Sequence, residues 1–274
     1  MAPPLVRPDH SELTLRVLSA AVILPLAVAA IWFGGWYFGL FVLAGAGAMG
    51  FELSRLCRAT PGVRALAMAA LVLVGGMAFA GAYREAFACV AGAAILIAVA
   101  ARVGRAVAPN LLPGGLVYIG IAVVSIFWLR VSESSGLAVF LWMVAVVVAT
   151  DIGAFFFGRA IGGPKLAPRV SPAKTWSGLV GGMVCAGLAG VLAVLANGGS
   201  GFVWAALASA GLAVVAQLGD LIESAVKRYC GVKDTGNLIP GHGGVLDRLD
   251  GFLTVAPTTA LMTWIAGGSP LEWQ

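Results

Sequence analysis

Long apolar runs separated by short polar segments are the dominant pattern along this chain. The runs are continuous and do not alternate apolar with polar residues, which argues against a membrane β-barrel. A helix that crosses a bilayer needs about 20 apolar residues. The pattern therefore predicts an all-α, polytopic integral membrane protein with about nine transmembrane helices. The expected spans are residues 14–33, 36–51, 63–83, 86–103, 111–130, 136–158, 176–196, 202–226 and 251–268.

The composition supports a single membrane domain. The chain has 274 residues, of which 60% are hydrophobic and 11% are charged, whereas a soluble domain carries about 25% charged residues. We expect one transmembrane domain over residues 1–274. Residues 1–135 form N-terminal membrane helices without a specific motif, and residues 136–274 form catalytic helices and loops. No small-residue cleavage site follows the first apolar run, so we interpret this run as a retained helix.

The distribution of positive charge predicts the topology. If the N-terminus is cytoplasmic, only Arg84 and Arg130 of the 17 Lys and Arg residues fall in outer segments. This asymmetry follows the positive-inside rule. The cations lie at the ends of apolar runs and form no basic stripe with aromatic residues, so the net charge of +5 does not indicate nucleic-acid binding. We expect a bacterial inner membrane protein whose polar loops face the cytoplasm.

Cysteine and glycine indicate packing. The four cysteines are scattered without a CxxC pair, so we expect small packing residues and no zinc or redox site. Gly178 and Gly182 form a GxxxG pair, which lets helices approach closely in lipid. We favour packing within the chain for this pair, with a homodimer interface as the alternative.

One polar stretch, residues 224–250, interrupts the apolar C-terminal half. Around its start, Asp220, Glu223, Ser224 and Lys227 have helical spacing that places them on one face. Asp247 and Asp250 are also three residues apart, and they share a face if the last helix begins near them. Such side chains beside a membrane are costly and indicate a function, although a structural ion pair is the alternative for the acids of residues 220 and 223.

Carboxylates and cations together suggest a metal and phosphate site. Carboxylate oxygens suit Mg²⁺, which often shares substrate phosphates as ligands, and we expect one ion or a pair. The predicted metal ligands are Asp220, Asp247 and Asp250. The cations match phosphate groups and are Lys227, Arg228, Lys233 and Arg248.

Two further segments carry candidate phosphate contacts. The glycines of the turn at residues 240–244, Gly243 and Gly244, offer backbone N–H groups for an anion. His242 either donates to a phosphate, acts as an acid or base, or holds the shape of the loop. Upstream, we expect Ser171, Lys174 and Thr175 to begin a helix whose N-terminus binds phosphate, with a simple helix cap as the alternative.

The polar stretch resembles the signature of the phosphatidate cytidylyltransferase family, also called CDP-diacylglycerol synthases. The matching positions are Ser224, Lys227, Arg228, Lys233, Asp234, Gly236, Pro240, His242, Gly243, Gly244, Asp247, Arg248 and Asp250. The segment that begins at Ser171 is similar to a second family motif, from which Ala173 and Ser177 depart. A dozen fixed positions in order make a chance match negligible.

The resemblance implies an enzyme that transfers the cytidylyl group of CTP to phosphatidate with Mg²⁺, giving CDP-diacylglycerol and pyrophosphate in phospholipid biosynthesis. It implies catalytic roles for Lys227, Arg228, Asp234, His242 and Arg248. It implies substrate contacts for Ser171, Lys174, Thr175, Ser224, Lys233, Gly243 and Gly244. The expected partners are CTP, phosphatidate and membrane lipids.

Other functions remain open at this point. A cytidylyltransferase for a different lipid phosphate fits the same residues, because no sequence feature indicates which lipid chains the protein recognises. A CDP-alcohol phosphotransferase does not fit, since Asp250 and Gly251 are not followed by the motif of that family. A transporter requires a polar path across the bilayer, and the polar residues cluster toward the predicted cytoplasmic side.

Overall fold

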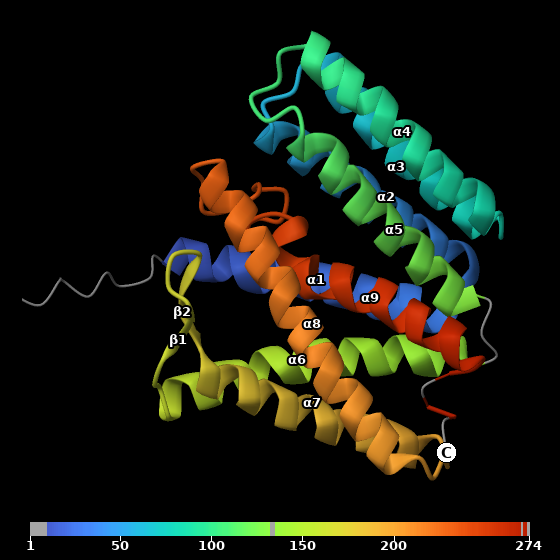
Figure 1. Ribbon diagram of the computed structural model, residues 1–274, viewed down its shortest axis with the longest axis vertical. Coiled ribbons are helices and arrows are strands. Elements are labelled where there is room, and N and C mark those ends of the chain that lie inside the picture. The colour runs from blue at the N-terminus through green and yellow to red at the C-terminus, as the bar shows by residue number, and fades with distance from the viewer. Residues whose placement is uncertain (1–9, 132–134, 270, 273–274) are drawn as a thin grey trace, which may run out of the picture.

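The computed structural model describes residues 10–131, 135–269 and 271–272, and these residues form nine helices and one small hairpin (Figure 1). The helices are α1 His10–Phe33, α2 Gly35–Leu56, α3 Pro61–Phe79, α4 Tyr83–Val103, α5 Leu111–Val131, α6 Gly136–Ala160, α7 Trp176–Ala196, α8 Phe202–Tyr229 and α9 Leu246–Ala266. Between α6 and α7 lie the antiparallel strands β1 Lys165–Ala167 and β2 Ser171–Thr175.

Eight of these helices, α1 to α8, are long and apolar enough to cross a membrane. This confirms the prediction of an all-α polytopic membrane protein. The second and fourth runs, which are short in the sequence, form full helices of 22 and 21 residues. The ninth predicted span corresponds to α9, which is as long but less apolar because Asp247, Arg248 and Asp250 fall within its first five residues.

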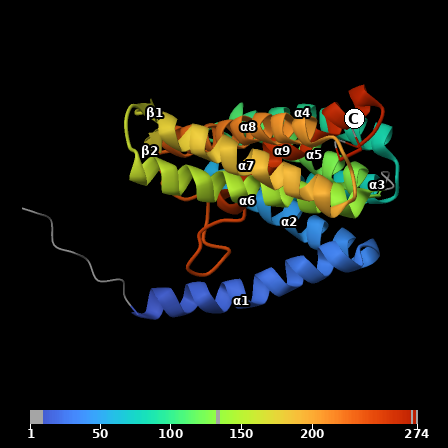
Figure 2. The same cartoon turned by 90° about the horizontal axis from the view of Figure 1, so that it is seen from below.

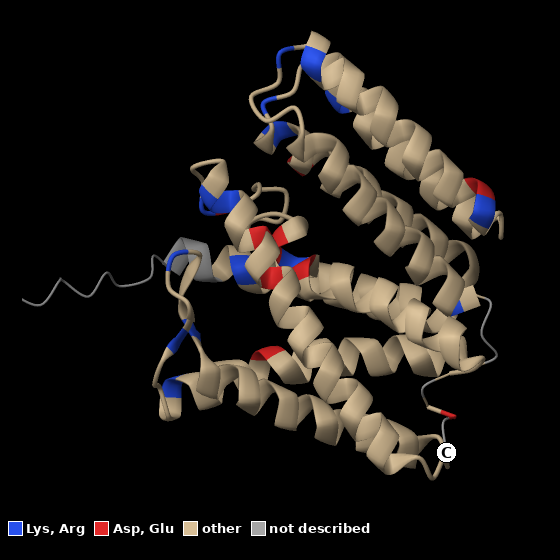
Figure 3. Cartoon of the chain, viewed as in Figure 1, with Lys and Arg blue, Asp and Glu red and all other residues tan. Residues whose placement is uncertain are grey.

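One end of the helix bundle carries most of the positive charge (Figure 3). The helices α2, α4, α6 and α8 finish at this end, α9 begins there, and the hairpin of β1 and β2 projects from it (Figure 1). We call it the basic end. Arg84, at the start of α4, and Arg130, at the finish of α5, belong to the opposite end. The separation of charge expected from the sequence is therefore present in the folded chain.

Close helix packing explains the glycine pair of α7. A Cβ added to Gly178 would lie 2.8 Å from the Ala154 carbonyl oxygen, and one added to Gly182 would lie 3.0 Å from that of Thr150. Both carbonyls belong to α6, so the pair serves packing within the chain. A homodimer would have to use another surface.

The first helix is separate from the main bundle. Figure 2 shows α1 lying below the other helices, where it packs against α2. Only 6% of its apolar span is buried, so most of its side chains would face lipid. The loop that precedes α9 descends to α1, where the Ser19 hydroxyl lies 2.9 Å from His242 Nδ1.

The segment from Ser171 to Thr175 forms strand β2 and not the start of a helix, which corrects the sequence prediction. Ser171 precedes Pro172, and a residue before proline is driven from helical toward extended backbone. The helix begins one residue later than Thr175, at Trp176. Thr175 is its N-cap, and its Oγ1 accepts a hydrogen bond of 3.1 Å from the Gly178 N–H.

The four cysteines are free. Cys57, just after α2, is fully buried, and burial raises the pKa of its thiol to about 12. This thiol stays protonated at neutral pH and acts as a packing residue, as the sequence predicted.

Candidate functional site

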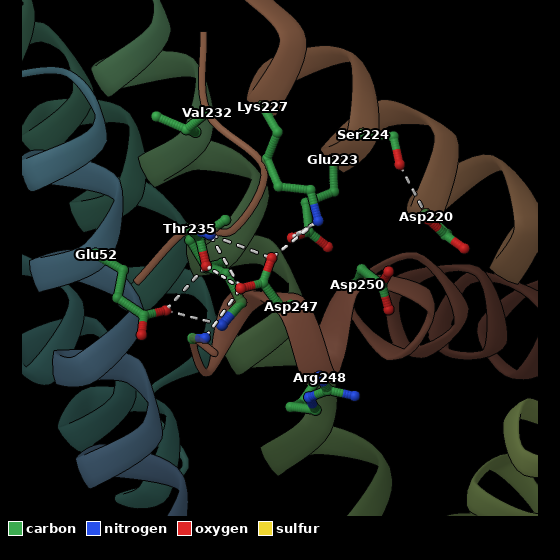
Figure 4. Close-up of polar contacts among 12 residues, drawn as sticks. Glu52, Asp220, Glu223, Ser224, Lys227, Val232, Thr235, Asp247, Arg248 and Asp250 are labelled. Carbon is green, nitrogen blue, oxygen red and sulfur yellow. Dashed lines mark hydrogen bonds and ion pairs between the residues drawn. The ribbon is translucent and has the colours of Figure 1, made fainter. Parts of the chain in front are cut away.

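Four carboxylates come together where α8 packs against α9 (Figure 4). Asp220 and Glu223 lie one turn apart on α8, and Asp247 and Asp250 lie one turn apart on α9. The last helix begins at Leu246, earlier than the apolar run suggested, and this start places both of its acids in the helix. The clustering expected from the spacing is therefore present.

Lys227 joins the two helices. Its Nζ lies 2.9 Å from Asp247 Oδ1 and 3.1 Å from Glu223 Oε1. These side chains are mostly shielded from solvent, with 16%, 6% and 11% exposed for Lys227, Asp247 and Glu223. The ammonium group is thus shared by two carboxylates, so in this arrangement Lys227 holds α8 to α9 and offers little to a phosphate.

Asp247 organises the loop before α9. Its Oδ2 accepts hydrogen bonds from the Thr235 N–H at 2.9 Å, the Thr235 hydroxyl at 3.0 Å and the Gly244 N–H at 2.9 Å. Its Oδ1 is paired with Lys227. A carboxylate with this many donors has few lone pairs left for a metal, although the sequence predicted Asp247 as a metal ligand. Its metal role stays a prediction.

Glu52 is a functional candidate that the sequence analysis missed. It lies on α2 with only 1% of its surface exposed. Its Oε1 accepts a hydrogen bond of 2.9 Å from the Val245 N–H, and its Oε2 accepts one of 2.9 Å from the Leu246 N–H. These are unpaired backbone donors at the start of α9, where a negative charge also favours the helix dipole. Glu52 therefore seats the N-terminus of the helix that carries Asp250.

The turn at residues 240–244 uses its backbone groups internally. Gly244 donates its N–H to Asp247, and His242 donates its N–H to the Ile239 carbonyl at 2.9 Å. Gly243 has φ of +88°, a left-handed conformation that favours glycine. A Cβ on Gly244 would lie 2.7 Å from Glu52 Oε2. The glycines shape a crowded turn, so the expected anion nest would need these N–H groups to be released.

His242 and Arg248 contact each other and not the carboxylates. The Arg248 guanidinium donates from Nε and Nη2 to the His242 carbonyl oxygen, at 3.0 and 2.6 Å. The His242 ring faces Ser19 of α1. This geometry matches the interpretation of His242 as a residue that holds the loop.

The hairpin delivers a second lysine to the cluster. Lys174, on β2, lies 2.5 Å from Asp220 Oδ2 through its Nζ, which also donates to Gln217 Oε1 at 2.8 Å. The Ser224 hydroxyl donates to Asp220 Oδ1 at 3.3 Å. Two segments that the sequence suggested separately, one before α7 and one along α8, thus meet at Asp220. Ser171 lies at the far end of β2, opposite Ala167.

The remaining predicted residues lie at the surface of the basic end. Arg228, near the end of α8, is exposed and lies 3.5 Å from the Val232 carbonyl through Nη1. Lys233 and Asp234, in the following loop, are exposed and line a cavity.

The donor set suits a hard cation that also binds substrate. Glu223 Oε1 is paired with Lys227 Nζ at 3.1 Å, and Asp250 Oδ1 accepts a hydrogen bond of 2.7 Å from the Gly251 N–H. Three of the four carboxylates pair with a lysine here: Asp220 with Lys174, and Glu223 and Asp247 with Lys227. Within the described residues, no three His, Cys, Asp or Glu side chains converge as a preformed metal cage. Mg²⁺ commonly takes only one or two carboxylates plus substrate phosphates, so the residues fit this ion.

Comparison with known proteins places the chain in a family. Residues 14–266 match the cytidylyltransferase family. The chain is 42% identical over 253 residues to the phosphatidate cytidylyltransferase of Brucella suis biovar 1 (strain 1330), which covers 90% of this chain and 91% of that protein. It is 42% identical over 142 residues to the enzyme of the same name from Bacillus subtilis (strain 168), covering 52% and 53% of the two chains. The chain belongs to the cytidylyltransferase family.

Proposed function

We propose that this member of the cytidylyltransferase family transfers the cytidylyl group of CTP to phosphatidate, which yields CDP-diacylglycerol and pyrophosphate. The observation that carries the proposal is the group of carboxylates and lysines at the contact of α8 with α9. Together with the family match over residues 14–266, it supplies the charges that a reaction between two phosphate-bearing substrates needs.

The reaction exchanges one phosphorus–oxygen bond for another. An oxygen of the phosphatidate phosphate attacks the α-phosphorus of CTP, and the bond from that phosphorus to the bridging oxygen of the β-phosphate breaks. Pyrophosphate leaves with the electron pair. A phosphatidate dianion needs no general base, which agrees with the position of His242 beside Ser19 and away from the carboxylates.

In this reaction the side chains of the protein bind the metal ion and orient the substrate phosphates. One or two of the carboxylates of Asp220, Glu223 and Asp250, together with substrate phosphates, would hold Mg²⁺, which when bound would neutralise developing charge on the phosphates. Lys174 fixes Asp220 from the hairpin side. Lys227 keeps α8 against α9, so that the acids of the two helices stay together. The ion pairs of Asp220 and Glu223 support this role, because side chains that are held in place can orient the reacting groups.

We further propose that the basic end faces the cytoplasm of a bacterial inner membrane. The placement of cations at this end follows the positive-inside rule (Figure 3). CTP is water-soluble and phosphatidate is a membrane lipid, so the reaction requires a site at the boundary of water and lipid. The carboxylate cluster lies in the last third of α8 and at the start of α9, which supports this placement.

A direct assay tests the function. Protein purified in detergent is incubated with CTP labelled at the α-phosphate, Mg²⁺ and phosphatidate, and label is measured in the lipid phase. We expect labelled liponucleotide that depends on phosphatidate and disappears with EDTA. Product with only another lipid phosphate, such as a polyprenyl phosphate, would keep the chemistry and replace the acceptor. No product with any acceptor would refute the proposal.

A further inference from the structure

A cavity lined by positive side chains lies next to the carboxylate cluster. It has a volume of about 370 Å³ and is formed by the end of α2 and the loop that follows α8. Its cations are Arg55 and Arg58 from the first segment and Lys233 from the second. We call it the cationic cavity. Its size falls in the range of ligand pockets, and its two arginines come from the half of the chain without a recognisable motif.

Among the residues that the structure describes, none of these three cations forms an ion pair. The described ion pairs of the carboxylate cluster involve Lys174 and Lys227 and none of the three. Arg55 lies 5.7 Å from the centre of the Phe51 ring, a cation–π contact that leaves its donors exposed. Asp234 is the single carboxylate among the lining residues. The excess of positive charge in a concave site attracts an anion.

Arg58 occupies a backbone position that favours glycine. It follows the end of α2 with φ of +51°, and the Ala59 N–H bonds to the Ser54 carbonyl at 2.9 Å. This is the left-handed residue of a Schellman turn, which is usually glycine. The equivalent residue after α8 is Gly231, with φ of +70°. Arg58 therefore lines the cavity from a backbone conformation that favours glycine over arginine.

The same turn elsewhere in the chain supplies a matched control. After α4, Arg105 has φ of +53° and the Ala106 N–H bonds to the Ala101 carbonyl at 2.9 Å. Arg105 is exposed and does not line the cationic cavity. The turn alone therefore does not mark a site, and it is the cavity that distinguishes Arg58 from Arg105.

Thr235 connects the cationic cavity to the acids. It lines the cavity, and its N–H and hydroxyl bond to Asp247. Thr235 and Leu56 also line a second cavity of about 250 Å³ that reaches Glu223 and Asp250 and is otherwise almost entirely apolar. The cations and the carboxylates thus lie on the two sides of one threonine.

We propose that the cationic cavity binds the β- and γ-phosphates of the nucleoside triphosphate, the part that leaves as pyrophosphate. The inference rests on the proposed function and names the residues that would hold this part of its soluble substrate. Three cations in a cavity built from polar loops suit a polyphosphate that arrives from water. With those phosphates in place, the α-phosphate would point past Thr235 toward the carboxylates.

Binding measurements on Arg58→Gly and Arg105→Gly test the proposal. Each variant removes an arginine and gives the left-handed turn its preferred residue, so both should fold at least as well as the unmodified protein. Equilibrium binding of pyrophosphate with Mg²⁺, of CTP and of a short-chain phosphatidate is measured by calorimetry in detergent. Loss of a charge-assisted hydrogen bond corresponds to a change of about tenfold to a hundredfold in Kd.

We expect Arg58→Gly to weaken pyrophosphate and CTP binding by at least about tenfold and to leave phosphatidate binding unchanged. Arg105→Gly should change none of the three. Unchanged pyrophosphate binding in Arg58→Gly would overturn the proposal, and a loss confined to phosphatidate would assign the cavity to the lipid phosphate instead. If the unmodified protein binds pyrophosphate through Arg58 but makes no liponucleotide, the cavity assignment stands and the proposed function fails.

Discussion

Replacement of Glu52 by glutamine tests whether α2 seats the last helix. The Glu52 carboxylate accepts one hydrogen bond from each of two backbone N–H groups, both at 2.9 Å. Glutamine has the same shape, but it keeps only one acceptor oxygen and turns an NH₂ group toward the second N–H donor. The variant therefore loses one charge-assisted hydrogen bond, weakens the other and leaves a buried donor without a partner.

The expected cost is about 2 kcal/mol. A buried donor left without its acceptor costs about 1–3 kcal/mol. Glutamine also avoids the desolvation of a buried carboxylate, which offsets part of the loss. A value of about 2 kcal/mol changes the ratio of seated to displaced α9 N-termini by roughly thirtyfold. Because Asp250 lies one turn into α9, its displacement should weaken the binding of Mg²⁺.

Two measurements separate positioning from general stability. The Tm in detergent should fall for Glu52→Gln, and the Mg²⁺ concentration for half-maximal liponucleotide synthesis should rise. A loss of folded protein alone would lower the maximal rate and leave that concentration unchanged. Glu85→Gln, at an exposed site in the first turn of α4, is the matched control. A Glu52→Gln protein with the original Tm and Mg²⁺ dependence would refute the seating role.

Three further substitutions test separate parts of the site. Asp250→Asn should reduce turnover by at least a hundredfold while the Tm in detergent stays within a few degrees, and near-normal turnover would remove Asp250 from the metal set. Lys174→Gln should lower kcat/KM by about tenfold, because Asp220 loses its ion pair, and Lys174→Arg should lower kcat/KM less. Equal kcat/KM in the unmodified protein and both variants would contradict a link between hairpin and site. Gly244→Ala should lower the Tm by several degrees, because its Cβ would lie 2.7 Å from Glu52 Oε2, and an unchanged melting curve would show that the turn relaxes.

The membrane helices could be predicted because each is specified by its own residues. A long apolar run forms a spanning helix whatever it packs against, since lipid leaves backbone groups no partner outside the helix. The acids at residues 220 and 223 were placed on one face by spacing alone. The strand at Ser171–Thr175 was missed because a hydroxyl-rich segment before an apolar run also fits a helix start, and its pairing with Lys165–Ala167 decides the conformation.

Glu52 and Arg58 were beyond the reach of sequence reasoning for a physical reason. Each acts on a segment more than 170 positions further along the chain, and no local pattern encodes that contact. The one available signal was Glu52 itself, an acid just beyond the predicted second span, at the border of the membrane, where charge is expensive. A sequence motif identifies candidate catalytic residues, whereas the helices and loops that position those residues are revealed only by the packing of the folded chain.

Asp247 and Asp250 are the same residue type, one turn apart on the same helix, yet their surroundings differ. Both lie in the first turns of α9, but Asp247 faces the preceding loop and accepts from Thr235 and Gly244. Asp250 lies one turn further, where its Oδ1 accepts a hydrogen bond of 2.7 Å from the Gly251 N–H. The first acid therefore holds the loop through hydrogen bonds and an ion pair, and we propose the second as the carboxylate that binds the metal. On this reasoning Asp247→Asn should disorder the loop and lower the Tm, whereas Asp250→Asn should leave the Tm intact and stop the reaction.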